Sequence, residues 1–178
     1  FTIARDHLIF GLGAIKNVGS SAIDSIIEAR KEKGCFSSLK DLCENVDLRL
    51  VNKRVVESLI KSGACDSLNQ NRAAMIEDLP FAIEMGQAKQ KDDQLGQSSM
   101  FEIFEGEKKE AESSNMLEDW SDRERLKYEK ETIGFYISGH PLEQFANELT
   151  WFADASSASI LENDTSGEVS IAGIPAKV

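Results

Sequence analysis

The first 90 residues contain one arrangement twice: a helical pattern of apolar residues, a tight turn, and a second helical pattern. In the first unit, apolar residues recur three and four positions apart over residues 8–30, with a turn signal at Asn17–Ser20. In the second unit the turn lies at Lys61–Ala64, and a helical pattern follows over residues 71–90. Each unit is too short to bury a core alone, so we expect the two to pack together in one helical domain, residues 1–90.

The ends of these expected helices carry suitable capping residues. Gly34 follows the first unit and should end its second helix, because glycine adopts the backbone conformation of a helix C-terminus at little cost. Ser38, with Asp41 three positions later, and Asn52 can each accept hydrogen bonds from the first backbone amides of a helix. Pro80 lies within the last helical pattern, where proline bends or interrupts a helix.

A polar linker is expected over residues 91–118, which are rich in Gln, Ser, Glu and Lys and too polar to fold alone. Within it, Met100 and Phe101 form an apolar pair that its charged neighbourhood cannot bury. Such anchors on an unstructured arm are typical of short linear motifs that dock into the pocket of a partner.

Helix is expected to resume after the linker, in a helical connector over residues 119–152. Ser121 with Glu124 predicts a capping box at its start, and Ser138–Pro141 should end or redirect the helix before a short amphipathic helix over residues 142–152.

The last part of the chain, residues 153–178, is predicted to be a linker followed by a strand, because apolar and polar residues alternate from Glu168 to Ile174. A first residue that is not Met and a final strand without a partner suggest a piece of a longer protein. No run approaches the ~20 apolar residues of a membrane span. The opening also lacks a secretory signal.

Charge is distributed unevenly along the chain. Residues 1–76 hold 11 basic and 9 acidic side chains, a net charge of +2, whereas the remainder holds 9 and 22, a net charge of −13. Binding to a polyanion such as nucleic acid is therefore expected only in the front section.

No catalytic or metal site is predicted. The three cysteines have no C-x-x-C spacing and are expected to be reduced and mostly buried, which suggests the cytoplasm. His140 has no nucleophile or carboxylate in a recognisable relation to it. Asp92 and Asp93 lie in the expected flexible linker, which cannot hold two metal ions ~3.5–4 Å apart.

The turn within Ile15–Ala22 is a candidate phosphate site. A tight turn of small residues leading into a helix directs backbone N–H groups outward at a helix N-terminus, which suits an anion. Such contacts select no base sequence. The alternative is that Gly19 only allows two helices to turn.

Three motifs carry a family resemblance: Phe10–Gly19 (FGLGAIKNVG), Val51–Ala64 (VNKRVVESLIKSGA) with Asp66, and Gly134–Leu142 (GFYISGHPL). In order and spacing, along nearly the whole chain, they resemble the alpha (catalytic) subunits of bacterial DNA polymerase III. The resemblance implies a mainly α fold: a tandem helix-hairpin-helix bundle, a segment that binds the beta sliding clamp, further helices, and the first strand of a truncated OB-fold. Asn17 departs from the first glycine of many such hairpins, but Asn also tolerates positive φ.

The resemblance implies that the hairpins grip duplex DNA through its phosphates. The candidate DNA-binding residues are Lys16, Asn17, Val18, Gly19, Ser20, Ser21, Lys53, Arg54, Lys61, Gly63 and Arg72. For each basic side chain the alternative is an ordinary solvated position. Arg72, at a predicted helix start, is the favoured candidate in the second hairpin.

The resemblance also implies a clamp-binding motif at Gln97–Phe101, comprising Gln97, Ser98, Ser99, Met100 and Phe101. Met100 and Phe101 would fill an apolar pocket, with the Gln97 amide at its rim. The parent would be a DNA-directed DNA polymerase, a nucleotidyltransferase that uses magnesium, with other polymerase III holoenzyme subunits as partners; the chain itself would bind no cofactor and no membrane.

Two alternatives remain open. A helix-hairpin-helix scaffold of a DNA-repair nuclease or ligase predicts DNA binding without a sliding clamp. An acidic helical adaptor predicts no DNA contact and is favoured by the overall charge of −11.

Overall fold

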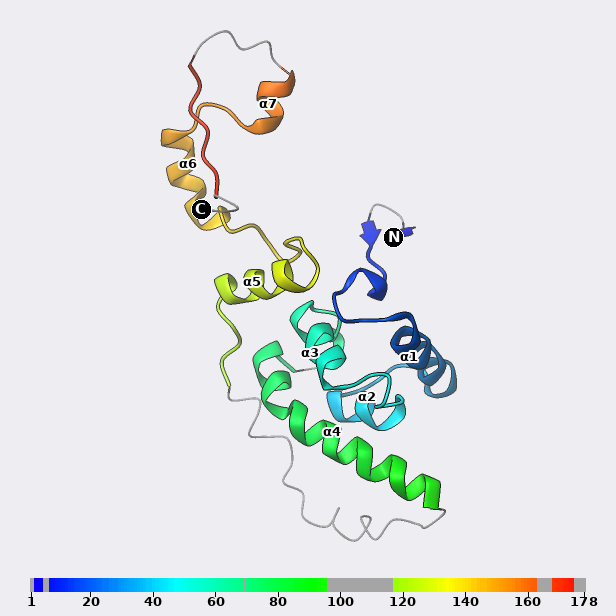
Figure 1. Ribbon diagram of the computed structural model, residues 1–178. Helices are drawn as coiled ribbons and strands as arrows, with labels where there is room; N and C mark the ends of the chain where they lie inside the picture. The colour runs from blue at the N-terminus through cyan, green and yellow to red at the C-terminus, as the bar shows by residue number, and fades with distance from the viewer. Residues whose placement is uncertain (1, 5–6, 69, 96–116, 163–167, 175–178) are drawn as a thin grey trace. The chain divides into compact units, whose positions relative to one another are not determined.

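The computed structural model describes residues 2–4, 7–68, 70–95, 117–162 and 168–174 (Figure 1). The chain divides into two units, Phe1–Tyr136 and Ile137–Val178. The first unit is a helical bundle. Its elements are β1 (Thr2–Ala4), β2 (His7–Ile9), the 3-10 turn η1 (Leu12–Ala14), α1 (Ser20–Lys33), α2 (Leu39–Asn45), α3 (Lys53–Lys61), the 3-10 turn η2 (Asp66–Leu68), α4 (Arg72–Leu95) and α5 (Asp122–Thr132).

The start of the chain differs from the prediction. β1 and β2 pair antiparallel, with Ile3 opposite Leu8, where the helical pattern was expected to begin. Among the described residues that precede α1, the one helical element is the 3-10 turn η1. Gly11 precedes this turn and Gly13 lies within it. Glycine in a helix costs about 1 kcal/mol relative to alanine, so apolar spacing alone does not produce a helix here.

The predicted helix ends are confirmed. The Ser38 hydroxyl accepts a hydrogen bond from the Asp41 amide, and Asn52 accepts from the amides of Arg54 and Val55. Gly34 ends α1 with φ of 94°, and its amide donates to the Arg30 carbonyl at 2.8 Å. Ser121 and Glu124 form the predicted capping box at the start of α5.

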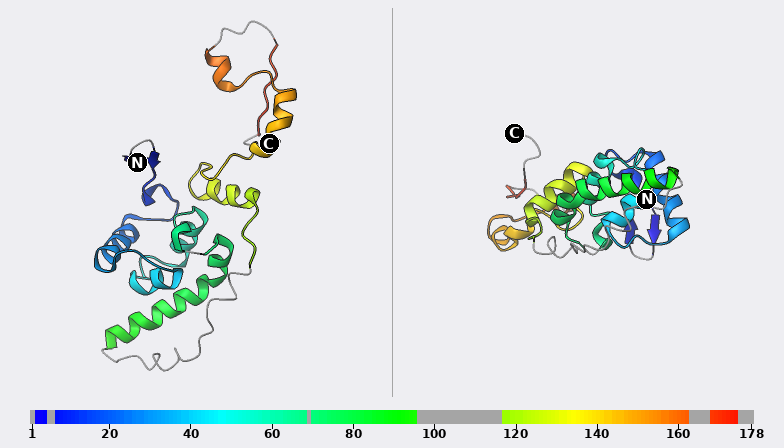
Figure 2. Two further views of the ribbon diagram at one scale, coloured as in Figure 1. Left: turned by 180° about the vertical axis from the view of Figure 1, so that it is seen from behind. Right: turned by 90° about the horizontal axis from the view of Figure 1, so that it is seen from below.

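The core of the first unit lies where α2 and α3 pack on α4 (Figures 1 and 2). It is built from aliphatic side chains supplied by α1 to α4 and the loops between them, and its largest fully buried members include Leu39, Val51, Val56, Ile60, Met75 and Leu79. The two hairpin units thus share one core, as predicted from their length. α4 continues through Pro80 without interruption and runs to Leu95, into the region predicted as linker.

Two of the three cysteines belong to this core. Cys43 and Cys65 are buried, and burial raises the pKa of each thiol to about 12. Both thiols are therefore poor nucleophiles, which agrees with the structural role expected for them. Cys35, in contrast, is exposed.

At Gly86, α4 lies directly against α2. A Cβ atom at Gly86 would lie 2.4 Å from the Cys43 carbonyl oxygen, at the C-terminal end of α2. One turn further along α4, the Gln90 side-chain amide donates to the Val46 carbonyl at 2.7 Å. Glycine therefore allows α4 to satisfy backbone carbonyls at the end of α2.

Replacing Gly86 with Ala should destabilise the first unit. Helix propensity alone favours Ala over Gly by about 1 kcal/mol. The added methyl group must displace backbone, however, and overpacking of this kind typically costs about 1–3 kcal/mol. Urea denaturation should show a net loss of stability, whereas Gln87→Ala, an exposed substitution on the same helix, should change stability by less than about 0.5 kcal/mol. A stabilised Gly86→Ala variant would contradict this packing.

The second unit contains the 3-10 turn η5 (Glu143–Phe145), α6 (Ala146–Phe152) and α7 (Ser157–Glu162). The helix expected over residues 142–152 is present as η5 and α6. The predicted strand is not formed over residues 168–174; there, the Asp154 and Ala155 amides donate to the Ser170 carbonyl. A strand needs a neighbouring strand to complete its ladder, and within the described part of the chain no strand pairs with these residues. A truncated OB-fold is therefore not shown.

Candidate nucleic-acid interface

The first hairpin turn is closed and has a left-handed residue where the sequence predicted one. Asn17 has φ of 68°, the only positive φ at a non-glycine residue in the described parts of the chain. The Val18 amide donates to the Ile15 carbonyl at 3.2 Å, and both side chains are buried. The buried side chains of Ile15 and Val18 thus hold the turn against the core, while Lys16 and Asn17 stay exposed.

The helix that follows this turn has an open N-terminus. Gly19 is the N-cap of α1, and among the described residues no side chain accepts a hydrogen bond from the first amides of α1. Ser20 and Ser21 are exposed. The first amides of a helix have no partner within the helix, and together with the helix dipole they favour an anion.

Contacts from α3 and α5 hold the turn in place. The Asn17 side-chain amide donates to the Ser58 hydroxyl on α3 at 3.1 Å. The Lys16 backbone amide donates to the Thr132 carbonyl at the end of α5, at 2.8 Å. The turn is therefore fixed on both sides before any ligand binds, which lowers the entropic cost of binding.

A cavity of about 250 Å³ lies beside the turn. Its lining combines the turn with α3 and the end of α5 and consists of Lys16, Asn17, Arg54, Glu57, Ser58, Lys61, Glu131 and Thr132. Lys61 pairs with Glu57 at 2.6 Å and lies 4.9 Å from the centre of the Tyr128 ring. Lys16 and Arg54 are exposed and form no ion pair with the residues that the structure describes, so both are available to an external anion.

Of the predicted DNA-binding residues, Lys16, Asn17, Arg54 and Lys61 line this cavity. Gly19, Ser20 and Ser21 follow Asn17 closely in the chain. Val18 lies beneath the turn, in the core. Lys53 is exposed at the start of α3 but does not line the cavity. The predicted clamp-binding residues Gln97–Phe101 lie outside the described residues.

Arg72 does not occupy the surface position that was predicted for it. Its side chain is 8% exposed and donates to Asp66 at 2.7 and 2.8 Å and to Glu129 at 3.0 Å. Burial alone would lower the pKa of Arg72, but these two carboxylates raise it above its usual value. The prediction failed because Glu129 lies 57 residues away in sequence, and no local pattern links the two.

Gly63 supports this ion pair and does not present an open turn. It has φ of 82°, and a Cβ atom there would lie 2.3 Å from the Arg72 guanidinium. The Gly63 and Ala64 amides donate to the Ile60 and Leu59 carbonyls, each at 3.0 Å. These amides are therefore used within the protein.

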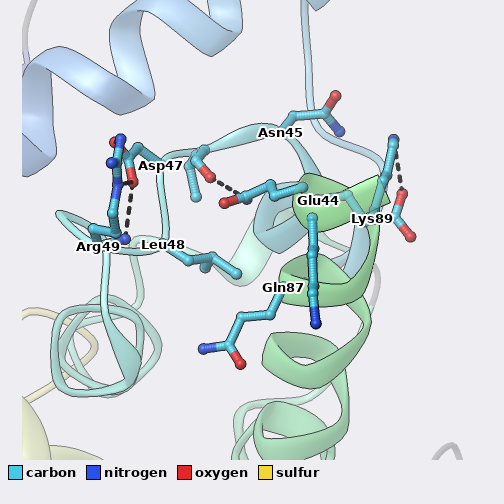
Figure 3. A pocket seen from close by; sticks show the side chains of 10 residues that line it. Glu44, Asn45, Asp47, Leu48, Arg49, Gln87 and Lys89 are labelled. Atoms are coloured by element: carbon cyan, nitrogen blue, oxygen red, sulfur yellow. Dashed lines mark hydrogen bonds and ion pairs between the residues drawn. The ribbon is translucent and has the colours of Figure 1, made fainter. Parts of the chain in front are cut away.

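A second, larger cavity of about 590 Å³ lies between the end of α2 and the end of α4 (Figure 3). Its charged side chains are mostly paired: Arg49 with Asp47 at 2.7 Å, and Lys89 with Glu44 at 3.3 Å. Hydrogen bonds from Arg49 lower the pKa of the Asp47 carboxyl below its usual value. In the smaller cavity beside the first hairpin, Lys16 and Arg54 form no ion pair with the residues that the structure describes, so that cavity is the better phosphate site.

Within the described residues, no group of three or more His, Cys, Asp or Glu side chains could hold a metal ion. None of the helices described is long and apolar enough to cross a membrane.

Comparison with known proteins identifies similar sequences. The family described as "Helix-hairpin-helix motif" matches residues 1–75. DNA polymerase III subunit alpha of Vibrio cholerae is 39% identical over 144 residues, which is 80% of this chain and 12% of that protein. The Escherichia coli K12 subunit gives the same identity and coverage. The Borreliella burgdorferi subunit is 35% identical over 176 residues, 98% of this chain and 15% of that protein. The chain thus spans only about one-seventh of the length of these relatives.

Proposed function

Because the chain belongs to the family of DNA polymerase III alpha subunits, of which it spans one segment, we propose that it serves a replicative DNA polymerase as a grip on duplex DNA. The observation that supports this most is that Lys16 and Arg54 line one cavity without an ion pair to any described residue, and that α1, which follows the same turn, has no side-chain cap at its N-terminus. A scaffold of a repair nuclease or ligase is less well supported, because the relatives named above are polymerase subunits.

In this proposal, one phosphate of the duplex backbone lies against the first amides of α1, and two neighbouring phosphates contact Lys16 and Arg54, one each. Backbone amides and flexible cations contact phosphate oxygens without reading base edges, so the grip tolerates any sequence. It lets a polymerase hold DNA while the duplex advances.

Replacing both Lys16 and Arg54 with Ala should weaken duplex binding by the full chain about 100-fold, since each charged hydrogen bond contributes about 1.5 kcal/mol. The plot of log affinity against log salt should also become shallower by about 1.8, because each lost phosphate contact removes about 0.9. Fluorescence anisotropy with a labelled duplex measures both quantities.

A matched control removes the same charge elsewhere. Lys31→Ala with Lys91→Ala deletes two exposed cations that lie away from the first hairpin, one late in α1 and one late in α4. Equal losses in the two double variants would mean that net charge, and not this site, governs binding.

We also propose that Gln97–Phe101 tethers the polymerase to the beta sliding clamp. This proposal rests on the sequence. A tether to a ring around DNA would make each rebinding to the primer end an intramolecular event, with a correspondingly high effective concentration.

The remaining expectations concern the whole protein. We propose that nucleotidyl transfer, with its magnesium ions and deoxynucleoside triphosphates, takes place in the bacterial cytoplasm on parts of the polymerase outside this chain, together with the other holoenzyme subunits. The chain alone should then incorporate no nucleotide on a primed template.

A further inference from the structure

The second hairpin also leads into a helix N-terminus, that of α4, but side chains of the protein already occupy it. The Ala73 amide donates to the Asp119 carboxylate at 3.3 Å, and the Ala74 amide donates to the Asn71 side chain at 2.7 Å. At the equivalent positions of α1, which follows the first hairpin, no side chain of the described residues caps the backbone amides.

The cation of the second hairpin is also occupied. The Arg72 guanidinium donates to Asp66 and to Glu129 and is buried. A phosphate group would need the same donors that these carboxylates already use, because carboxylates and phosphates both accept hydrogen bonds from backbone amides and guanidinium groups.

The segment that carries Asp119 is fixed to α4 and α5. The Asn71 side-chain amide donates to the Leu117 carbonyl at 2.7 Å, across 46 residues of sequence. Asp119 also accepts a hydrogen bond from the Trp120 amide at 2.9 Å, and the Trp120 ring centre lies 4.4 Å from that of Tyr128 on α5. Residues 117–120 thus lead directly into α5, whose Glu129 completes the contact with Arg72.

We propose that Asp119 is an internal anion that occupies the second hairpin, so that this hairpin binds the protein's own residues 117–132 and leaves DNA phosphate to the first hairpin. This inference rests on the proposed function and specifies which of two similar hairpins performs it. Residues 117–132 would then belong to the DNA-binding unit, because α5 contacts both hairpins: Thr132 contacts the first and Glu129 contacts the second.

The test is a titration of the full chain with inorganic phosphate, followed by amide NMR. In the unmodified chain, phosphate should shift the amide signals of Ser20 and Ser21 and leave that of Ala73 unchanged. In Asp119→Ala, phosphate should shift the Ala73 signal as well. In Asp119→Asn, the carboxamide oxygen can still accept from Ala73, so its response should stay small.

Two outcomes would overturn the inference: a phosphate-dependent shift of Ala73 in the unmodified chain, or no such shift in Asp119→Ala. The side chain of Asp119 is exposed, so the variants should fold, and a thermal melt checks this. Glu118→Ala is the matched control, because it removes the same charge one residue away.

A duplex titration of the same variants separates this inference from the proposed function. Asp119→Ala should bind DNA several-fold more tightly than Glu118→Ala, with a salt dependence steeper by about 0.9, the contribution of one added phosphate contact. Equal affinities of the two variants would count against the inference that removal of Asp119 frees the second hairpin to bind a phosphate. Failure of every variant, including the unmodified chain, to bind DNA would instead contradict the proposed grip, and the phosphate response of Ala73 would still decide the role of Asp119.

Discussion

Replacing Arg72 with Ala should lower the free energy of unfolding by about 3–5 kcal/mol, the usual cost of removing one partner from a buried ion pair. Glu129 has a side chain with 0% exposure, and in this variant it would lose its guanidinium partner without gaining access to water. Urea denaturation followed by far-UV circular dichroism measures the change.

Two comparisons isolate the cause. Arg54→Ala removes an exposed arginine from α3 and should change stability by less than about 0.5 kcal/mol. Arg72→Met combined with Glu129→Leu should recover much of the loss, because apolar residues of similar size often replace a buried ion pair without penalty. A loss below about 1 kcal/mol in Arg72→Ala would show instead that Arg72 lies at the surface, as expected of the DNA-binding residue that the sequence predicted.

Substituting Gln97, Met100 and Phe101 together with Ala should abolish binding of the full chain to a bacterial beta sliding clamp. In short docking motifs a few apolar anchors supply most of the binding energy, about 2 kcal/mol or more each. Loss of two anchors and a rim hydrogen bond therefore weakens binding by at least about 1000-fold, beyond the range of surface plasmon resonance for a micromolar complex.

The matched control lies within the same motif. Ser98→Ala with Ser99→Ala keeps the anchors and should change affinity by less than about threefold, because flanking polar residues of such motifs stay in solvent. Unchanged clamp affinity in the triple variant would contradict the proposed tether. It would have no bearing on the proposed DNA grip.

Local chemistry made several features predictable from the sequence. Ser38, Asn52 and Ser121 each cap a helix, because the hydrogen bonds involved join residues two or three positions apart. The turn at Asn17 was predictable for the same reason, as was the sharing of one core by two short units. The first predicted helix was wrong because two glycines outweighed the apolar spacing around η1.

The features that could not be predicted depend on contacts between distant parts of the chain. Nothing in the local sequence shows that Glu129 pairs with Arg72, that Thr132 accepts from Lys16, or that Asp119 lies at the start of α4. These three contacts decide which hairpin is open. Sequence patterns therefore located both hairpins, and only the three-dimensional arrangement distinguishes them.

The most direct test of the central claim is the salt dependence of duplex binding by the unmodified chain. With a net charge of −11, the chain as a whole should repel DNA, so binding at about 50 mM salt requires a local phosphate site. We expect such binding, with similar affinity for duplexes of unrelated sequence and a linear fall of log affinity with log salt. No binding at low salt, or an affinity independent of salt, would contradict it.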